Sequence, residues 1–118
     1  MPLTPEHVCG KDCMLGSCTI IVVDNKHSIV DIATNIAKFY EYESCGKCTP
    51  CREGTLRILS LLENISMGRA KLKDINTLQE LAEVIKESSF CGLGQTATQH
   101  LLTALSYFRE EFEAKCQK

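Results

Sequence analysis

A cysteine group with a fixed spacing constrains this chain more than any other feature of its sequence. Cys45, Cys48 and Cys51 form a Cys-x2-Cys-x2-Cys run, and Cys91 follows after a gap of thirty-nine residues. The whole chain has eight cysteines in 118 residues. A secreted disulfide scaffold would need a signal peptide, and the start of the sequence has neither the basic residues nor the apolar stretch of one. Reduced thiols that bind a metal are therefore the better interpretation.

The spacing of the run indicates which metal group it suits. Zinc sites usually take their cysteines as Cys-x2-Cys pairs from two separate knuckles. Three thiolates at positions i, i+3 and i+6 suit three iron corners of one 4Fe-4S cluster, and the fourth corner then takes a ligand from elsewhere in the chain. We therefore predict one 4Fe-4S cluster on Cys45, Cys48, Cys51 and Cys91. Zinc in the same site, a disulfide pair and plain buried thiols are the alternatives.

Hydrophobic periodicity predicts a mainly α-helical chain. After an irregular arm, the β-branched run from Thr19 to Val23 predicts a short strand, and a single strand needs a partner. Ser28, with Asp31 three residues later, has the form of an N-terminal capping box. Four amphipathic helices follow, and we expect them to pack as a four-helix bundle. Their predicted core positions are Ile29, Ile32, Ala33, Ile36, Ala37 and Tyr40; Ile58, Leu59, Leu62 and Ile65; Ile75, Leu78, Ala82 and Ile85; and Leu101, Ala104, Leu105, Phe108 and Phe112.

The lengths of the middle two helices explain the gap before Cys91. We expect one helix over about 51–66, ended by Gly68, and a return helix over about 74–89 that is capped by Asp74. At about 1.5 Å of rise per residue, each helix travels roughly 23 Å. The pair should therefore bring Cys91 back to the end of the bundle where the three clustered cysteines lie.

Positive charge and glycine surround the predicted site. Lys47 and Arg52 flank the cysteines, and Cys51 lies in the first turn of a helix, where unpaired amide hydrogens and the positive end of the dipole point outward. These features favour an anionic cluster. Three glycines, Gly46, Gly92 and Gly94, should let backbone amides approach the sulfurs. Gly92 and Gly94 should also break the chain before the fourth helix.

The other cysteines and histidines are weaker candidates. Cys9, Cys13 and Cys18, with His7, could hold a second metal, but their x3 and x4 spacings match no common site. Structural thiols are the preferred interpretation of this group. Cys116 is expected to be a free thiol. His27 and His100 are expected to be surface or packing residues rather than ligands.

Charge and hydropathy argue against two classes of function. The formal charge of −2 gives no basic field that would attract nucleic acid. The longest aliphatic run, Ile20 to Val23, is far shorter than the roughly 20 residues that span a bilayer. We therefore expect a cytoplasmic protein with no nucleic-acid partner and no direct membrane insertion.

The residues around the cysteine run also form a recognisable sequence motif. Residues 43–55, Glu-Ser-Cys-Gly-Lys-Cys-Thr-Pro-Cys-Arg-Glu-Gly-Thr, resemble the signature of the NADH-oxidising flavoprotein subunit of respiratory complex I and of the β subunits of NAD(P)-linked iron-only hydrogenases and formate dehydrogenases. Residues 89–95 look like the segment that supplies the fourth ligand, in a wording closer to the hydrogenase branch. Residues 16–24 are similar to the last strand of the β-grasp domain that precedes the bundle in that family. The resemblance runs from about residue 14 to residue 113.

This resemblance implies a function. In the family, the bundle holds a single 4Fe-4S cluster that accepts electrons one at a time from a reduced flavin and passes them to iron–sulfur centres of a neighbouring subunit. Cys45, Cys48, Cys51 and Cys91 fall on the ligand positions. The chain would then be a non-catalytic electron-transfer subunit, in a hetero-oligomer with a flavoprotein NAD(P)H-binding subunit and an iron–sulfur acceptor subunit. The alternatives are a structural adaptor stapled by zinc or a cluster, and a fragment of a full-length flavoprotein dehydrogenase.

The sequence also departs from the family pattern. No Gly-x-Gly-x-x-Gly motif occurs, so neither FMN nor NAD binding is assigned to this chain. Cys18 stands where the family usually has glycine. We expect two parts, an arm and strand over 1–27 that is a remnant of a β-grasp region, and a four-helix iron–sulfur domain over 28–118. We also expect an independent small subunit rather than a fragment.

Overall fold

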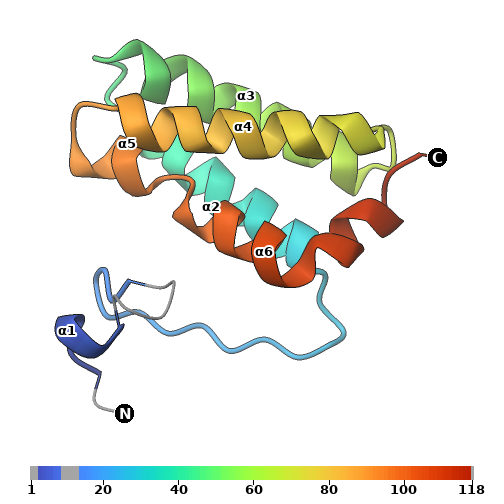
Figure 1. Ribbon diagram of the computed structural model, residues 1–118, viewed down its shortest axis with the longest axis horizontal. Coiled ribbons are helices and arrows are strands. Elements are labelled where there is room, and N and C mark those ends of the chain that lie inside the picture. Colours follow the sequence, from blue (N-terminus) through green and yellow to red (C-terminus); the bar gives the residue numbers. More distant parts are fainter. Residues whose placement is uncertain (1–2, 9–13, 118) are drawn as a thin grey trace.

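The computed structural model describes residues 3–8 and 14–117, and within them the chain is mainly helical (Figure 1). Cys9 and Cys13, two members of the candidate second metal site, lie outside the described residues. None of the described helices is long and apolar enough to cross a membrane. The helices are α1 (Pro5–Val8), α2 (Ile29–Glu43), α3 (Thr49–Ser66), α4 (Leu72–Ser88), α5 (Gly92–Thr96) and α6 (Gln99–Ala114).

The four long helices bury their apolar stripes against one another. Helix α3 packs on α2 and α4, and α6 packs on α2 and α4, so each long helix contacts two others around one shared core. In Figure 1, α3 and α4 run side by side, and the arm that precedes α2 lies on the opposite side of the molecule from them. The predicted stripe of α4 is entirely buried. The core is formed by Val30, Ala33, Ala37, Ile58, Leu61, Leu62, Ile65, Ala70, Ile75, Leu78, Ala82, Ile85, Leu101, Ala104, Leu105 and Phe112.

Some predicted core positions lie at the edge of the core rather than inside it. Ile32 and Ile36 of α2 are only half-buried, because they face a groove beside α6 rather than the centre of the bundle. Phe108 of α6 is 47% exposed. Its backbone is non-helical (φ −129°, ψ 29°), so the helix bends there, and Phe112 rather than Phe108 fills the core.

The start of α2 is capped by one side chain rather than by a reciprocal box. The Ser28 hydroxyl accepts a hydrogen bond from the Val30 N–H at 3.3 Å, as its position predicts. The expected return contact from Asp31 is wrong. Its carboxylate accepts a hydrogen bond from the Ser66 hydroxyl at 2.7 Å and lies 3.5 Å from Lys115 Nζ, because this end of the bundle offers it stronger partners.

The return helix starts earlier than expected. Helix α4 begins at Leu72, and Asp74 lies in its first turn rather than at the cap position. The Asp74 carboxylate accepts the Lys71 N–H at 2.8 Å, so the residue still satisfies an unpaired donor at the helix start. Gly68, with φ +72°, ends α3 as predicted.

The predicted strand over Thr19 to Val23 is wrong for the part of the chain that the structure describes. Ile20, Ile21 and Val22 are 70%, 72% and 89% exposed, and no described segment lies beside them as a strand. Strand propensity is present, but a strand forms only where a neighbour takes up its backbone hydrogen bonds.

Helical turns also replace two irregular segments of the prediction. The N-terminal arm contains α1. Gly92 and Gly94 do not break the chain but lie inside α5. The Gln95 N–H donates to the Cys91 carbonyl at 3.1 Å, and the Thr96 hydroxyl donates to the Gly92 carbonyl at 2.7 Å. These bonds close a single turn despite the low helix propensity of glycine.

Candidate metal centre

The four cysteines that the sequence singles out line one cavity. This cavity holds about 140 Å³ and opens at the end of the bundle where α3 begins. Cys48 and Cys51 are buried, whereas Cys45 and Cys91 are exposed. The cavity is lined by Glu43, Ser44, Cys45, Gly46, Lys47, Cys48, Cys51, Cys91 and Leu93.

The helical hairpin explains how Cys91 reaches the other three cysteines. Helix α3 has 18 residues and α4 has 17, so they travel roughly 27 Å and 26 Å along the bundle. The two lengths nearly cancel, and the chain leaves α4 beside the loop where it entered α3. The expected out-and-back geometry is therefore present, although both helices start two residues earlier than the sequence indicated.

Two of the cysteines stand at helix starts. Cys48 is the N-cap residue of α3, with Pro50 in the first turn, and Cys91 is the N-cap residue of α5. Amide hydrogens in the first turn of a helix have no partner within the helix, and the positive end of the α3 dipole adds to their effect. The cavity is thus bordered by donors suited to negatively charged sulfur.

Backbone donors act directly on Cys48. The backbone N–H of Phe90 lies against the sulfur and holds the pKa of the Cys48 thiol below its ordinary value, and the Cys51 N–H and the charge of Arg52 act in the same direction. Phe90 belongs to the segment that carries Cys91. The two cysteine segments therefore contact each other through Cys48, and the thiolate form that metal binding requires is favoured there.

Arg52 fixes the shape of the cysteine loop. Its Nη1 donates to the Gly46 carbonyl at 2.8 Å, and its Nη2 lies 3.4 Å from the Thr49 hydroxyl. Gly46 has φ +74°, a left-handed conformation that glycine adopts at little cost. Arg52 thus holds the turn between Cys45 and Cys48. The sequence predicted only that its positive charge would favour an anionic cluster.

Gly94 is required by close packing. A Cβ placed at Gly94 would lie 2.4 Å from the Ser89 Cβ and 3.2 Å from the Cys51 Cβ. The start of α5 can therefore approach Cys51 only because position 94 has no side chain. Gly92 differs, because a Cβ there would meet no described atom within 4 Å. The protein atoms alone do not explain glycine at position 92.

Sequence reasoning missed Ser44. Its hydroxyl Oγ lies 3.2 Å from the Cys51 Sγ, and it also accepts the Gly46 N–H at 3.4 Å. A serine beside a cysteine run carries no signal of its own. The contact depends on where α2 ends, which the sequence places only to within a few residues.

The arrangement of the thiols bears on the kind of metal group they fit. Across the described residues, no three Cys, His, Asp or Glu side chains are placed to hold one metal ion. The four cysteines nevertheless line a common cavity, so they surround a space rather than converge on a point. Four thiols around one cavity, with amide donors and positive charge nearby, form a donor set that fits a 4Fe-4S cluster.

The remaining cysteines that the structure describes lie apart from this cavity. Cys18 is exposed and has φ +62°. Cys116 is half-buried, and its thiol donates to the Phe112 carbonyl at 3.3 Å. Burial, together with the charges of Asp74 and Glu113, raises the pKa of Cys116, so its thiol stays protonated.

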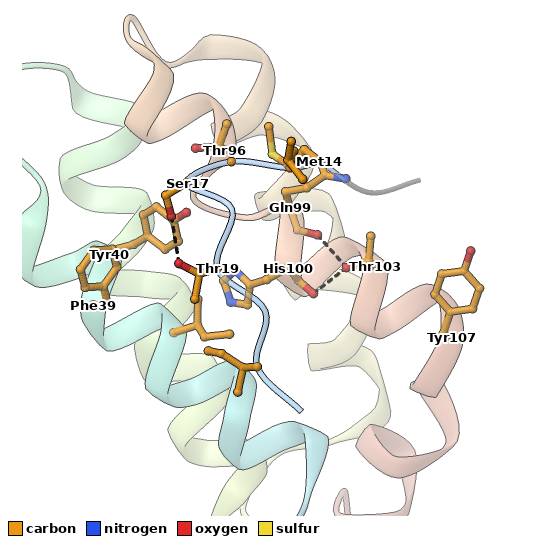
Figure 2. Close-up of a pocket in the computed structure, with 14 residues that line it drawn as sticks. Met14, Ser17, Thr19, Phe39, Tyr40, Thr96, Gln99, His100, Thr103 and Tyr107 are labelled. Carbon is orange, nitrogen blue, oxygen red and sulfur yellow. Dashed lines mark hydrogen bonds between the residues drawn. The ribbon is translucent and has the colours of Figure 1, made fainter. Parts of the chain in front are cut away.

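A larger cavity lies elsewhere. It holds about 630 Å³ between the arm and helices α2 and α6 (Figure 2). The His100 ring stacks on Tyr40 there with 6.0 Å between ring centroids, and its Nε2 lies 3.3 Å from the Ala33 carbonyl. Burial lowers the pKa of His100 to about 4, although the Ala33 carbonyl acts the other way. His100 is thus a packing residue, as expected, and none of the cysteines that the structure describes lines this cavity.

A mainly helical domain with four thiols around one cavity defines a class of iron–sulfur module. The sequence profile of the NADH-ubiquinone oxidoreductase-F iron-sulfur binding region matches residues 31–115. The chain therefore belongs to this family, and the region it contains is one that binds a 4Fe-4S cluster.

Individual relatives agree with the family assignment. The chain is 41% identical over 113 residues to an NADH-quinone oxidoreductase subunit of Streptomyces coelicolor, covering 96% of this chain and 25% of that protein. It is 38% identical over 101 residues to the HndC subunit of the NADP-reducing hydrogenase of Solidesulfovibrio fructosivorans, covering 86% of this chain and 21% of that protein. The chain thus spans about a quarter or less of the length of these relatives.

A solved structure shows the same fold. The chain superposes on part of an NAD+-reducing [NiFe]-hydrogenase in the air-oxidized state with a TM-score of 0.82 and 33% sequence identity. The match covers 99% of this chain and 21% of the hydrogenase chain.

Proposed function

We propose that this chain is an electron-transfer module in which Cys45, Cys48, Cys51 and Cys91 hold one 4Fe-4S cluster. The observation that carries the proposal is the cavity that all four thiols line. The family match supports it, because residues 31–115 include the four cysteines. When bound, such a cluster takes up and releases one electron at a time.

The residues around the cavity have separate tasks in this proposal. Cys48 and Cys51 hold the inner side of the cluster away from water, since both are buried. The amides at the start of α3 and the charges of Lys47 and Arg52 offset the negative charge of four thiolates and the cluster core. Arg52 holds the turn of the first cysteine segment, and Gly94 lets the segment after Cys91 pack closely on Ser89 and Cys51.

The exposed thiols define the side on which electrons enter or leave. Cys45 and Cys91 are exposed, and Phe90 beside Cys91 is 84% exposed. This side of the cluster would therefore lie close to a partner protein in a complex. We infer a hetero-oligomer in which a flavoprotein NAD(P)H-binding subunit supplies electrons and an iron–sulfur subunit accepts them. The relatives are named as subunits of an NADH-quinone oxidoreductase and of an NADP-reducing hydrogenase, which supports a complex of several subunits.

The proposal divides the chain into two parts. Residues 28–118 form a four-helix bundle that holds the cluster, since α2, α3, α4 and α6 share one core. Residues 1–27 form an arm whose extended stretch over 19–23 is exposed, in the way expected of a strand that pairs only within a larger assembly.

Metal analysis tests this proposal. The chain is purified anaerobically, or reconstituted with iron and sulfide, and assayed for both elements. About four irons and four acid-labile sulfides per chain are expected. Cys48→Ser and Cys91→Ser should lose most of both, whereas Cys116→Ser, which changes a thiol remote from the cavity, should keep them. One zinc per chain without sulfide would contradict the relay and favour a structural adaptor.

A further inference from the structure

We propose that the Ser44 hydroxyl donates a hydrogen bond to the Cys51 sulfur and thereby raises the reduction potential of the cluster. This inference rests on the proposed function, because it assigns a task to Ser44 only if Cys51 is a cluster ligand. Ser44 is a positioning and tuning residue in this account, since it acts through the sulfur of Cys51.

The geometry places the hydroxyl well for this task. Oγ of Ser44 lies 3.2 Å from Sγ of Cys51, which is close for a hydrogen bond to sulfur. Ser44 is the C-cap residue of α2, and its backbone N–H donates to the Tyr40 carbonyl at 3.0 Å. The end of a 15-residue helix therefore holds the serine backbone in place.

A second contact orients the hydroxyl. The backbone N–H of Gly46 donates to the Ser44 oxygen at 3.4 Å, so one lone pair of that oxygen is engaged on the side away from its own hydrogen. A hydroxyl group has one hydrogen to give and two lone pairs to receive. With the Gly46 amide on one lone pair, the hydrogen is free to point at Cys51.

The direction of the bond follows from chemistry. A cysteine that ligates iron is a thiolate and has no hydrogen, so only the serine can be the donor. A hydrogen bond to a charged acceptor is stronger than one between neutral groups. It stabilises negative charge on the sulfur, and that charge is greater when the cluster is reduced. The bond therefore favours the reduced state, as hydrogen bonds to cluster sulfurs generally do.

The setting of Cys51 strengthens the effect. Its side chain is only 5% exposed, so little water competes for its sulfur. Cys48, by contrast, receives backbone amides, from Phe90 and Cys51. Substitution of Ser44 by alanine leaves those backbone amides in place but removes the hydroxyl that donates to Cys51. Ser44 is thus a point at which the potential can be changed without altering the ligand set.

The capping contact of Ser44 can be separated from the hydroxyl. The bond to the Tyr40 carbonyl comes from the backbone N–H, which Ser44→Ala keeps. Ser44→Thr keeps the hydroxyl and adds a methyl group. Ser88→Ala is the matched control, because it removes an exposed serine hydroxyl from the end of α4 that donates to the Val84 carbonyl rather than to a cysteine.

The experiment is a redox titration of the anaerobically reconstituted chain, followed by electron paramagnetic resonance, with iron and sulfide measured on each sample. At a fixed solution potential, Ser44→Ala should lower the ratio of reduced to oxidised cluster between about threefold and tenfold. Tenfold corresponds to about 59 mV for one electron. Ser44→Thr should stay within about twofold of the parent chain, and Ser88→Ala should match it.

The outcomes separate this inference from the function on which it rests. A Ser44→Ala chain with full iron and sulfide and an unchanged potential overturns the assignment of Ser44 but leaves the cluster. A Ser44→Ala chain that holds no cluster also overturns it, because the serine would then be structural. A parent chain that binds no iron or sulfide overturns the proposed function itself.

Discussion

Gly94 offers the most demanding test of the packing around the cysteines. A methyl group at this position would lie 2.4 Å from the Ser89 Cβ, 2.5 Å from its Oγ and 3.2 Å from the Cys51 Cβ. Real Cβ atoms do not approach other atoms so closely, so Ser89 or the start of α5 must move. Ser89 is 6% exposed, and its hydroxyl donates to the Ile85 carbonyl at 2.7 Å, so it has little room to move.

The magnitude of the effect follows from two costs. Overpacking a filled interior costs about 1–3 kcal/mol. Displacing Ser89 leaves a buried hydroxyl or carbonyl without its partner, at about 1–3 kcal/mol. Alanine is the better helix former and returns up to about 1 kcal/mol. Gly94→Ala should therefore lower the free energy of unfolding by about 3 kcal/mol, which corresponds to a fall of about 10 °C in the melting temperature for a chain of this size.

The assay is urea and thermal unfolding of the reduced, metal-free chain, followed by circular dichroism. Gly92→Ala is the matched control, because the added methyl group meets no described atom within 4 Å. It should change the free energy of unfolding by less than about 1 kcal/mol. If Gly94→Ala and Gly92→Ala unfold alike, the approach of α5 to Cys51 described above is incorrect.

Three further predictions concern the rest of the molecule. Leu62→Ala, at a fully buried site, should cost about 2–5 kcal/mol in urea unfolding, whereas Leu56→Ala on the same helix, at a site 53% exposed, should cost less than about 1 kcal/mol; equal losses would argue against the assigned core. The pKa of His100 is lowered to about 4, so between about pH 6.5 and pH 4 the unfolded chain binds a proton that the folded chain does not. The free energy of unfolding should therefore decrease by up to about 3 kcal/mol as the pH is lowered from about 6.5 to about 4. His100→Asn should flatten that slope, and a slope that persists unchanged would place the effect elsewhere. Arg52→Lys keeps the charge but cannot bridge Gly46 and Thr49 together. A chelator should therefore remove iron several-fold faster from Arg52→Lys than from the parent chain or from the control Arg57→Lys, which changes an exposed arginine of the same helix. Equal rates would show that only the charge of Arg52 matters.

The helices could be predicted from the sequence because each carries its own signal. Ile75, Leu78, Ala82 and Ile85 recur at the helical period, and all four are buried. Phe108 fits the same kind of pattern but is half-exposed. Its exposure depends on a bend in α6, and apolar spacing contains no information about a bend.

The sequence predicted a strand that the described residues do not form, because the stability of a strand depends on a neighbour. Thr19 to Val23 has the right residues, yet these residues are largely exposed and no described segment pairs with them as a strand. Propensity measures how well a residue suits a sheet and does not supply the sheet.

Some features of the candidate site were likewise predictable from the sequence, and others were not. The cysteine spacing and the two similar helix lengths predicted that Cys91 would return to the other three, and the shared cavity agrees with that geometry. The contact between Ser44 and Cys51 was not predictable. A close approach at Gly94 was predicted, but its packing against Ser89 was not. Both depend on backbone positions to within a few tenths of an ångström, which residue spacing does not specify.

Anomalous X-ray diffraction at the iron edge, from crystals of the anaerobically reconstituted chain, tests the central claim most directly. The account predicts a four-iron peak inside the cavity, bonded to Cys45, Cys48, Cys51 and Cys91. A single zinc peak, or an iron cluster to which Cys91 is not bonded, would contradict it.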